Sequence, residues 1–246
     1  MRLIKTFLFL SLSASSVLAQ APETPAPAAA ADRSKVSDEV RKLLTEARDM
    51  RVQHRYSDAL TKLDEAEKLS PSLADIYALR GDIYLAPRRR DFDLALPQFE
   101  KAAELEPQSP LPKFNLAEYH FVKHDFNTAL QSFTKLTADY PKLPMVIRHL
   151  VHYKRMLCEL KLGHRPAAEQ VVADNFTFMD DTPAYYFSKA ALAFDLGDTA
   201  KANEWVQRGV AVFKGPNCEP YYDAFKELRW VPDMDLNKPK EQPKQP

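Results

Sequence analysis

The chain has 246 residues, and its 34 basic and 34 acidic side chains give a formal net charge of zero at pH 7. A neutral chain has no general attraction for nucleic acids or anionic lipids, so we expect no nucleic-acid partner. Glycine is scarce, with five residues in the whole chain, and this composition favours helices over sheets.

The first residues of the chain have the pattern of a secretory signal, which we assign to 1–19. Arg2 and Lys5 form a basic head, the short apolar run TFLFLSL follows, and a stretch of small residues ends at Ala19. We predict cleavage after Ala19 and export to the periplasm or the extracellular space, with no transmembrane segment after cleavage. An uncleaved anchor is the alternative, but the apolar run is short for a hydrocarbon core of about 30 Å.

Two segments of low complexity flank the central part of the chain. Residues 20–36 are rich in proline and alanine, and we predict an extended, disordered linker there. Residues 233–246 offer almost no apolar side chain to bury and are predicted to be a disordered tail. The remaining residues, 37–232, are numerous enough for one elongated domain with a continuous core.

One helical pattern recurs along this central part. The sequence DFDLALPQFEKAAELEP at 91–107 is followed at 125–141 by DFNTALQSFTKLTADYP, with Phe, Ala-Leu, Phe and Pro in the same order. An alanine with a bulky residue four positions later occurs five times, at steps of 36, 34, 39 and 34 residues. The five pairs are Ala59 with Leu63, Ala95 with Phe99, Ala129 with Phe133, Ala168 with Val172 and Ala202 with Val206.

A second helical segment precedes several of these copies and carries a small residue among aromatic ones. It reads IYALRGDIY at 76–84, KFNLAEYHF at 113–121 and YFSKAALAF at 186–194. A small residue on each helix lets two axes approach closely, and large residues one turn away fill the remaining space. Because an isolated helix of about 13 residues is marginal in water, each helix pair must pack on the next pair.

This arrangement resembles the tetratricopeptide repeat, whose first helix carries aromatic, small and aromatic residues and whose second carries alanine, an aromatic residue and a closing proline. The resemblance implies an all-α fold, a right-handed α-solenoid of about five helix-turn-helix repeats. The repeats are expected at about 40–73, 74–109, 110–143, 144–182 and 183–214, with the fourth departing most from the pattern. Residues 219–231 are predicted to form a capping helix that covers the last apolar face.

In this family the first helix of each pair lines the concave side, where partners bind. Carried over to this sequence, the resemblance implies a groove formed by Arg41, Arg48, Arg51, Phe114, Glu118, Phe121, Tyr153, Phe187 and Phe194. We expect Arg48 and Arg51 to act as charge anchors and the phenylalanines as hydrophobic anchors for a helix or an extended peptide. The alternative is that the aromatic residues are packed by the protein's own C-terminal segment or by a second copy of the chain.

No catalytic motif is present, and we expect no catalytic residue, no cofactor and no metal site. His120 and His124 lie one helical turn apart, but no carboxylate or cysteine lies in register with them, so solvated or packing histidines are favoured. His149 and His152 form a similar pair.

Two further features leave alternatives open. The two cysteines, Cys158 and Cys218, would be able to pair in an oxidising compartment, although small buried thiols are favoured. The basic turn at 88–90 would suit an acidic or phosphate-bearing surface, although a solvated turn is the simpler interpretation.

These features together favour an exported, non-catalytic protein–protein interaction module of the bacterial cell envelope. We expect it to bind a peptide or helix of a partner in its concave groove. The alternative function is a self-assembling structural scaffold of the envelope, which would be a homo-oligomer. A metal-dependent enzyme is a weaker alternative.

Overall fold

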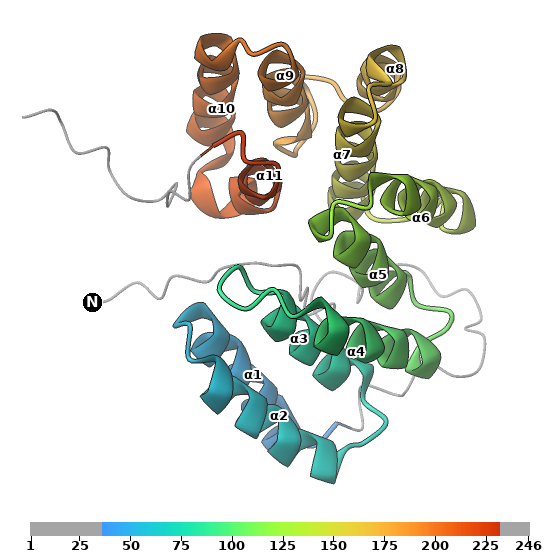
Figure 1. Ribbon diagram of the computed structural model, residues 1–246, viewed down its shortest axis with the longest axis vertical. Coiled ribbons are helices and arrows are strands. Elements are labelled where there is room, and N and C mark those ends of the chain that lie inside the picture. Colours follow the sequence, from blue (N-terminus) through green and yellow to red (C-terminus); the bar gives the residue numbers. More distant parts are fainter. Residues whose placement is uncertain (1–35, 232–246) are drawn as a thin grey trace, which may run out of the picture. The chain divides into compact units, whose positions relative to one another are not determined.

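The computed structural model describes residues 36–231, which form eleven α-helices and no β-strand (Figure 1). The predicted all-α solenoid of helix-turn-helix repeats, followed by a C-terminal helix, is thereby confirmed for this part of the chain. The predicted signal at 1–19, nearly all of the linker at 20–36 and the tail at 233–246 lie outside the described residues.

The described residues divide between Pro141 and Lys142 into two compact units. We name them unit 1 (36–141) and unit 2 (142–231). The repeat pattern carries no sign of this division, because Pro141 closes one repeat in the same way as Pro107 closes the repeat before it.

Unit 1 contains three helical hairpins. Their helices are α1 (Asp38–Val52), α2 (Tyr56–Leu69), α3 (Ala74–Leu85), α4 (Phe92–Leu105), α5 (Pro110–Val122) and α6 (Phe126–Asp139). The first helices pack in a row, α1 on α3 and α3 on α5, while α2 and α4 each pack on the first helix of the next hairpin. Helices α3 and α5 therefore each contact both helices of the preceding hairpin.

Unit 2 contains two hairpins and one further helix. Its helices are α7 (Met145–Lys161), α8 (Arg165–Asn175), α9 (Ala184–Asp195), α10 (Thr199–Phe213) and α11 (Gly215–Glu227). Helix α11 packs on α10 and also on the first helices α7 and α9 (Figure 1). Among residues 36–231, no helix is both long enough and apolar enough to cross a membrane.

Short polar side chains set where several helices begin. The Oγ atom of Ser37 accepts a hydrogen bond from the amide of Val40 at the start of α1, at 3.3 Å. Asp91, Asp125 and Asp198 cap α4, α6 and α10 in the same way, at 3.2, 3.2 and 3.0 Å. Each cap satisfies an amide that has no partner inside the helix, so these residues fix where α1 and three of the second helices begin.

The turns inside the hairpins repeat one backbone geometry. In four of the five hairpins, an amide donates to the carbonyl oxygen five residues earlier, for example from Asp125 to His120 at 2.9 Å. The residue before that amide has a positive φ, which is 63° at His124 and 80° at Gly163. This is the helix-ending motif in which glycine is preferred, because other residues are strained in the left-handed region.

The core of each hairpin follows the predicted small–large pattern. All five alanines of the repeated pairs are fully buried, and so are the bulky partners Leu63 and Phe133. In the second hairpin, a Cβ atom placed on Gly81 would lie 2.7 Å from Cε1 and Cζ of Phe99. The small residue on the first helix therefore makes the space that the aromatic ring of the second helix fills.

Candidate partner-binding surfaces

The first helices of unit 1 bring four charged side chains together. Arg48 and Arg51 come from α1, Asp82 from α3 and Glu118 from α5, and we name this set the charged cluster. Burial raises the pKa of Asp82 to about 6, while Arg51 and Arg48 oppose the rise and Glu118 adds to it. The four charges therefore act on one another although they come from three repeats.

The cluster is partly buried among the first helices. Arg51 is buried, whereas Arg48, Asp82 and Glu118 are only half-buried. Arg41, the other predicted cation of α1, is exposed and pairs instead with Asp38 of its own helix, at 2.6 Å. Exposed ion pairs of this kind contribute little to stability, so Arg41 remains available to a partner.

The phenylalanines predicted for unit 1 lie in the core. Phe114 is 5% exposed and Phe121 is 0% exposed. Their rings pack on α6, with centroid distances of 5.9 Å from Phe114 to Phe133 and 5.7 Å from Phe121 to Phe126. The expectation of exposed hydrophobic anchors is corrected here, because the aromatic positions of the repeat pattern face the second helix of the same hairpin.

The aromatic residues predicted for unit 2 are covered by the chain itself. Tyr153 and Phe187 are 0% exposed, and Phe194 is 7% exposed. All three rings contact Phe225 of α11, at centroid distances of 6.2, 5.8 and 5.1 Å. The Tyr153 hydroxyl also donates to the carbonyl oxygen of Tyr221, at 3.0 Å. These residues thus follow the alternative interpretation, in which the protein's own C-terminal segment packs them.

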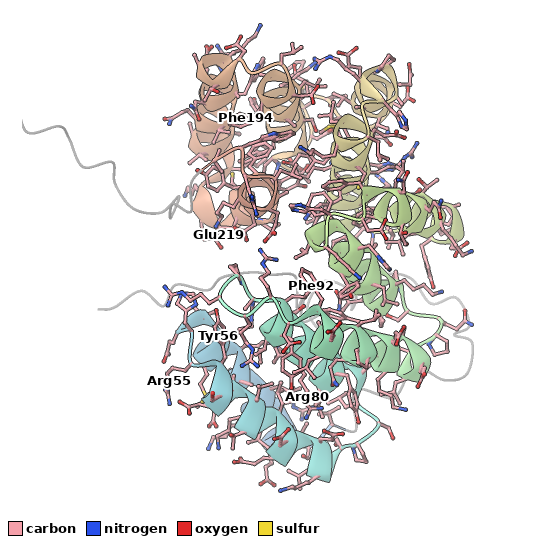
Figure 2. The ribbon with its side chains drawn as sticks, viewed as in Figure 1. Arg55, Tyr56, Arg80, Phe92, Phe194 and Glu219 are labelled. Carbon is pink, nitrogen blue, oxygen red and sulfur yellow. The ribbon has the colours of Figure 1, made fainter. Side chains whose placement is uncertain are left out.

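An ionic network between α2 and α3 was not predicted. Arg80, which is labelled in Figure 2, is buried. Its Nη2 atom lies 2.9 Å from Oδ1 of Asp64 and 2.6 Å from Oε2 of Glu67. The Tyr77 hydroxyl lies 2.9 Å from Oε1 of Glu67 and 2.7 Å from the carbonyl oxygen of Pro71. An arginine within the apolar run IYALRGDIY was the signal in the sequence. The network joins one repeat to the next and is a structural feature.

The histidines and cysteines serve local packing. Nδ1 of His149 lies 2.8 Å from Oγ1 of Thr182, and the His124 ring stacks on Phe126 at 5.4 Å. Within residues 36–231, no group of three or more side chains is arranged to hold a metal ion. Cys158 and Cys218 are buried, and burial raises the pKa of the Cys218 thiol to about 12.

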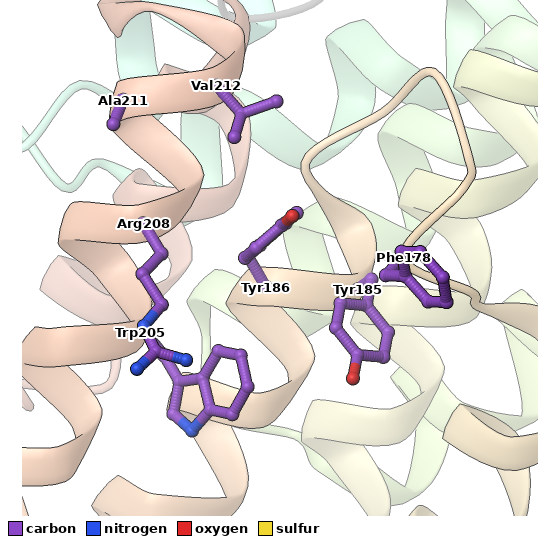
Figure 3. A pocket seen from close by; sticks show the side chains of 7 residues that line it. All are labelled: Phe178, Tyr185, Tyr186, Trp205, Arg208, Ala211 and Val212. Carbon is purple, nitrogen blue, oxygen red and sulfur yellow. The ribbon is translucent and has the colours of Figure 1, made fainter.

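Unit 2 also carries an aromatic pocket that the sequence pattern did not reveal (Figure 3). Its volume is about 440 Å³, and it lies between the loop after α8, the start of α9 and the second half of α10. We name it the aromatic pocket, and its lining residues are Phe178, Tyr185, Tyr186, Trp205, Arg208, Ala211 and Val212.

The rings of the aromatic pocket are arranged at steep angles to one another. The indole of Trp205 is 6.1 Å from the ring of Tyr185, at an interplanar angle of 89°, and 6.3 Å from that of Tyr186. The guanidinium of Arg208 lies over the indole, 4.9 Å from its centroid (Figure 3). At the rim, Phe178 is 65% exposed and Val212 is 58% exposed, so both side chains present apolar surface beside the pocket.

Comparison with known proteins agrees with this architecture. Residues 44–110 and 86–144 match the family model of the tetratricopeptide repeat. A sequence search of curated proteins gives no match.

Three solved structures illustrate the similarity of fold. A tetratricopeptide repeat protein from Parabacteroides merdae has 15% identity and a TM-score of 0.59, over 77% of this chain and 71% of that one. PilF of Pseudomonas aeruginosa has 15% identity and a TM-score of 0.56, over 78% and 86%. PilW, a widely conserved type IV pilus biogenesis factor, has 18% identity and a TM-score of 0.58, over 79% and 88%.

Proposed function

We propose that this protein is a non-catalytic interaction module that binds a peptide or helix of a partner protein in the bacterial cell envelope. The match of residues 44–110 and 86–144 to the tetratricopeptide repeat model supports this proposal. Arrays of such repeats present extended surfaces built from successive first helices. The envelope location is supported by the predicted export signal at 1–19 and by the similar fold of PilW, a type IV pilus biogenesis factor.

The charged cluster is the observation that carries this proposal. Partly buried charges are costly to desolvate, and the alanine–aromatic core of the repeats does not require them. The planar guanidinium groups of Arg48 and Arg51 suit carboxylates of a partner. Asp82 and Glu118 would repel any partner carboxylate that lies beside them instead of beside the arginines. The arrangement therefore favours a partner segment with acidic side chains at defined positions.

The burial of the predicted phenylalanines changes where the partner binds. Phe114 and Phe121 lie in the core beneath the first-helix surface of unit 1 and are not part of that surface. We propose that the partner contacts Arg41, Arg48, Arg51 and Glu118 directly. The corresponding face of unit 2 is closed, because α11 packs on α7 and α9.

The test is capture of the partner by the mature chain from the native envelope, followed by binding measurements with the identified partner. Replacing Arg48 and Arg51 together by Gln, or by Glu, is expected to weaken binding at least tenfold while the circular dichroism spectrum stays helical. The gentler Gln variant is included because Arg51 is buried. Lys101→Glu with Lys135→Glu is the matched control, because both lysines are exposed on second helices.

Three outcomes contradict the proposal. Equal binding by the arginine variants and the lysine control would show that the charged cluster is not the site. Binding that is as strong in 0.5 M salt as in 0.1 M salt would exclude charge recognition as its basis. Light scattering that shows a stable homo-oligomer whose assembly requires Arg48 and Arg51 would favour the self-assembling scaffold instead.

A further inference from the structure

We propose that the aromatic pocket of unit 2 binds the C-terminal tail of the same chain, residues 233–246, in a polyproline II conformation. The pocket and the tail both belong to the C-terminal half of the sequence. The charged cluster belongs to unit 1, so this inference is independent of the proposed function and can fail without it.

The chemistry of the aromatic pocket suits proline. Proline rings are apolar and stiff, and they pack on the faces of Trp and Tyr side chains in known modes of proline-rich recognition. A polyproline II segment has no internal hydrogen bonds, so its carbonyl oxygens need donors from the pocket. Within the described residues, the hydroxyls of Tyr185 and Tyr186 and the indole N–H of Trp205 make no hydrogen bond, and all three belong to pocket-lining residues. The guanidinium of Arg208 adds further donors beside them.

The tail has the matching sequence. It ends in NKPKEQPKQP, with prolines at 239, 243 and 246. Polyproline II has three residues per turn, so Pro243 and Pro246 lie on one edge of the helix, about 9 Å apart. Two prolines on one edge can contact two aromatic faces at the same time. The exposed side chains of Phe178 and Val212 extend that apolar contact at the rim.

The tail is also long enough. The described chain ends just after Trp230, whose ring stacks on Phe194 at a centroid distance of 5.7 Å. Tyr186 precedes Phe194 by eight residues on α9, which corresponds to about 12 Å along the helix axis. The twelve residue steps from Val231 to Pro243 span up to about 37 Å in the polyproline II conformation. The prolines can therefore reach the pocket with slack in the connection.

A short connection also reduces the affinity that is needed. Tethering by a short flexible segment gives an effective concentration in the millimolar range, so a dissociation constant of about 1 mM suffices for half occupancy. Pro22 and Pro25 have the same three-residue spacing as Pro243 and Pro246, but they precede unit 1 in the chain. The C-terminal tail is the proline-rich segment joined directly to the unit that contains the pocket.

Paramagnetic broadening in the full mature chain tests the proposal. A nitroxide attached through Gln245→Cys reports on the tail, and the buried native thiols are protected from labelling. The indole N–H resonance of Trp205 is assigned with Trp205→Phe. It is expected to lose roughly half of its intensity or more, because the tail should occupy the pocket in at least about half of the molecules. The amide of Ala167, exposed on α8 away from the pocket-lining residues, serves as the reference and should keep its intensity.

Two variants decide the result. Pro243→Ala with Pro246→Ala is expected to restore the Trp205 resonance, whereas Pro22→Ala with Pro25→Ala should leave the broadening unchanged. Equal broadening of Trp205 and Ala167, or no broadening, overturns the proposal. Broadening that also appears when nitroxide-labelled chains are mixed with isotope-labelled, nitroxide-free chains would assign the tail of a second copy to the pocket and would likewise overturn it.

Discussion

Replacing Gly81 by Ala tests the close approach of α3 and α4. The new Cβ atom would lie 2.7 Å from Cε1 and Cζ of Phe99, well inside van der Waals contact, and the ring is 1% exposed and cannot move into solvent. Overpacking of a core typically costs about 1–3 kcal/mol, and the better helix propensity of Ala returns up to about 1 kcal/mol. We therefore expect Gly81→Ala to lower the free energy of unfolding by about 1–2 kcal/mol.

Urea unfolding followed by circular dichroism measures this effect. With an m-value of roughly 2–3 kcal/mol/M, the unfolding midpoint should fall by about 0.5 M. Adding Phe99→Leu should recover part of the loss, with a coupling energy of about 1 kcal/mol between the two positions. Ala117→Gly, at the corresponding position of α5, should also destabilise the protein because it leaves a space beside the core. If Gly81→Ala raises the urea midpoint of unfolding, the reasoning that a small residue is needed beside the ring of Phe99 is wrong.

Three further predictions address other parts of the molecule. Phe121→Ala removes a fully buried ring and should lower the free energy of unfolding by about 3–5 kcal/mol in urea titrations. A change below about 1 kcal/mol would contradict the placement of Phe121 in the core. The pKa of Asp82 is raised to about 6 in the folded state, whereas an Asp side chain in the unfolded chain has a pKa of about 3.9. The protonated carboxyl group therefore stabilises the folded state fully below pH 3.9, and this stabilisation is lost as the pH rises through 6. Asp82→Asn should therefore gain about 2 kcal/mol relative to the wild type between pH 4 and pH 7, and a difference that does not change with pH would refute this. Arg229→Gly relieves a φ of 58° after α11 and should stabilise the protein by about 0.5–1 kcal/mol in thermal unfolding, whereas Arg229→Ala should not.

The fold could be predicted from the sequence because packing between neighbouring helices repeats along the chain. Ala95 and Ala129 occupy equivalent positions and are both fully buried, as their spacing requires. The capping aspartates and the turns follow the same period. A local pattern that recurs five times needs no long-range information to be recognised.

The site could be predicted only in part. The pattern placed Arg48, Arg51 and Glu118 on first helices, where they do meet in the charged cluster with Asp82. It could not separate the aromatic residues that face a groove from those that face the second helix, because both kinds follow helical spacing. The aromatic pocket brings a loop residue, Phe178, beside side chains of α9 and α10, and helical periodicity says nothing about such loops.

The placement of α11 has a consequence for assembly. A stack of like repeats has no inherent last member, since each exposed end resembles the surface on which the next repeat would dock. Helix α11 turns back after the single residue Lys214 and lies on α7, α9 and α10. Helix α11 thereby occupies surface of α9 and α10 on which a sixth hairpin would pack, and it contacts α7 in addition. Head-to-tail polymerisation into filaments is disfavoured at that end, and fusing extra repeats after residue 213 would first require α11 to be displaced.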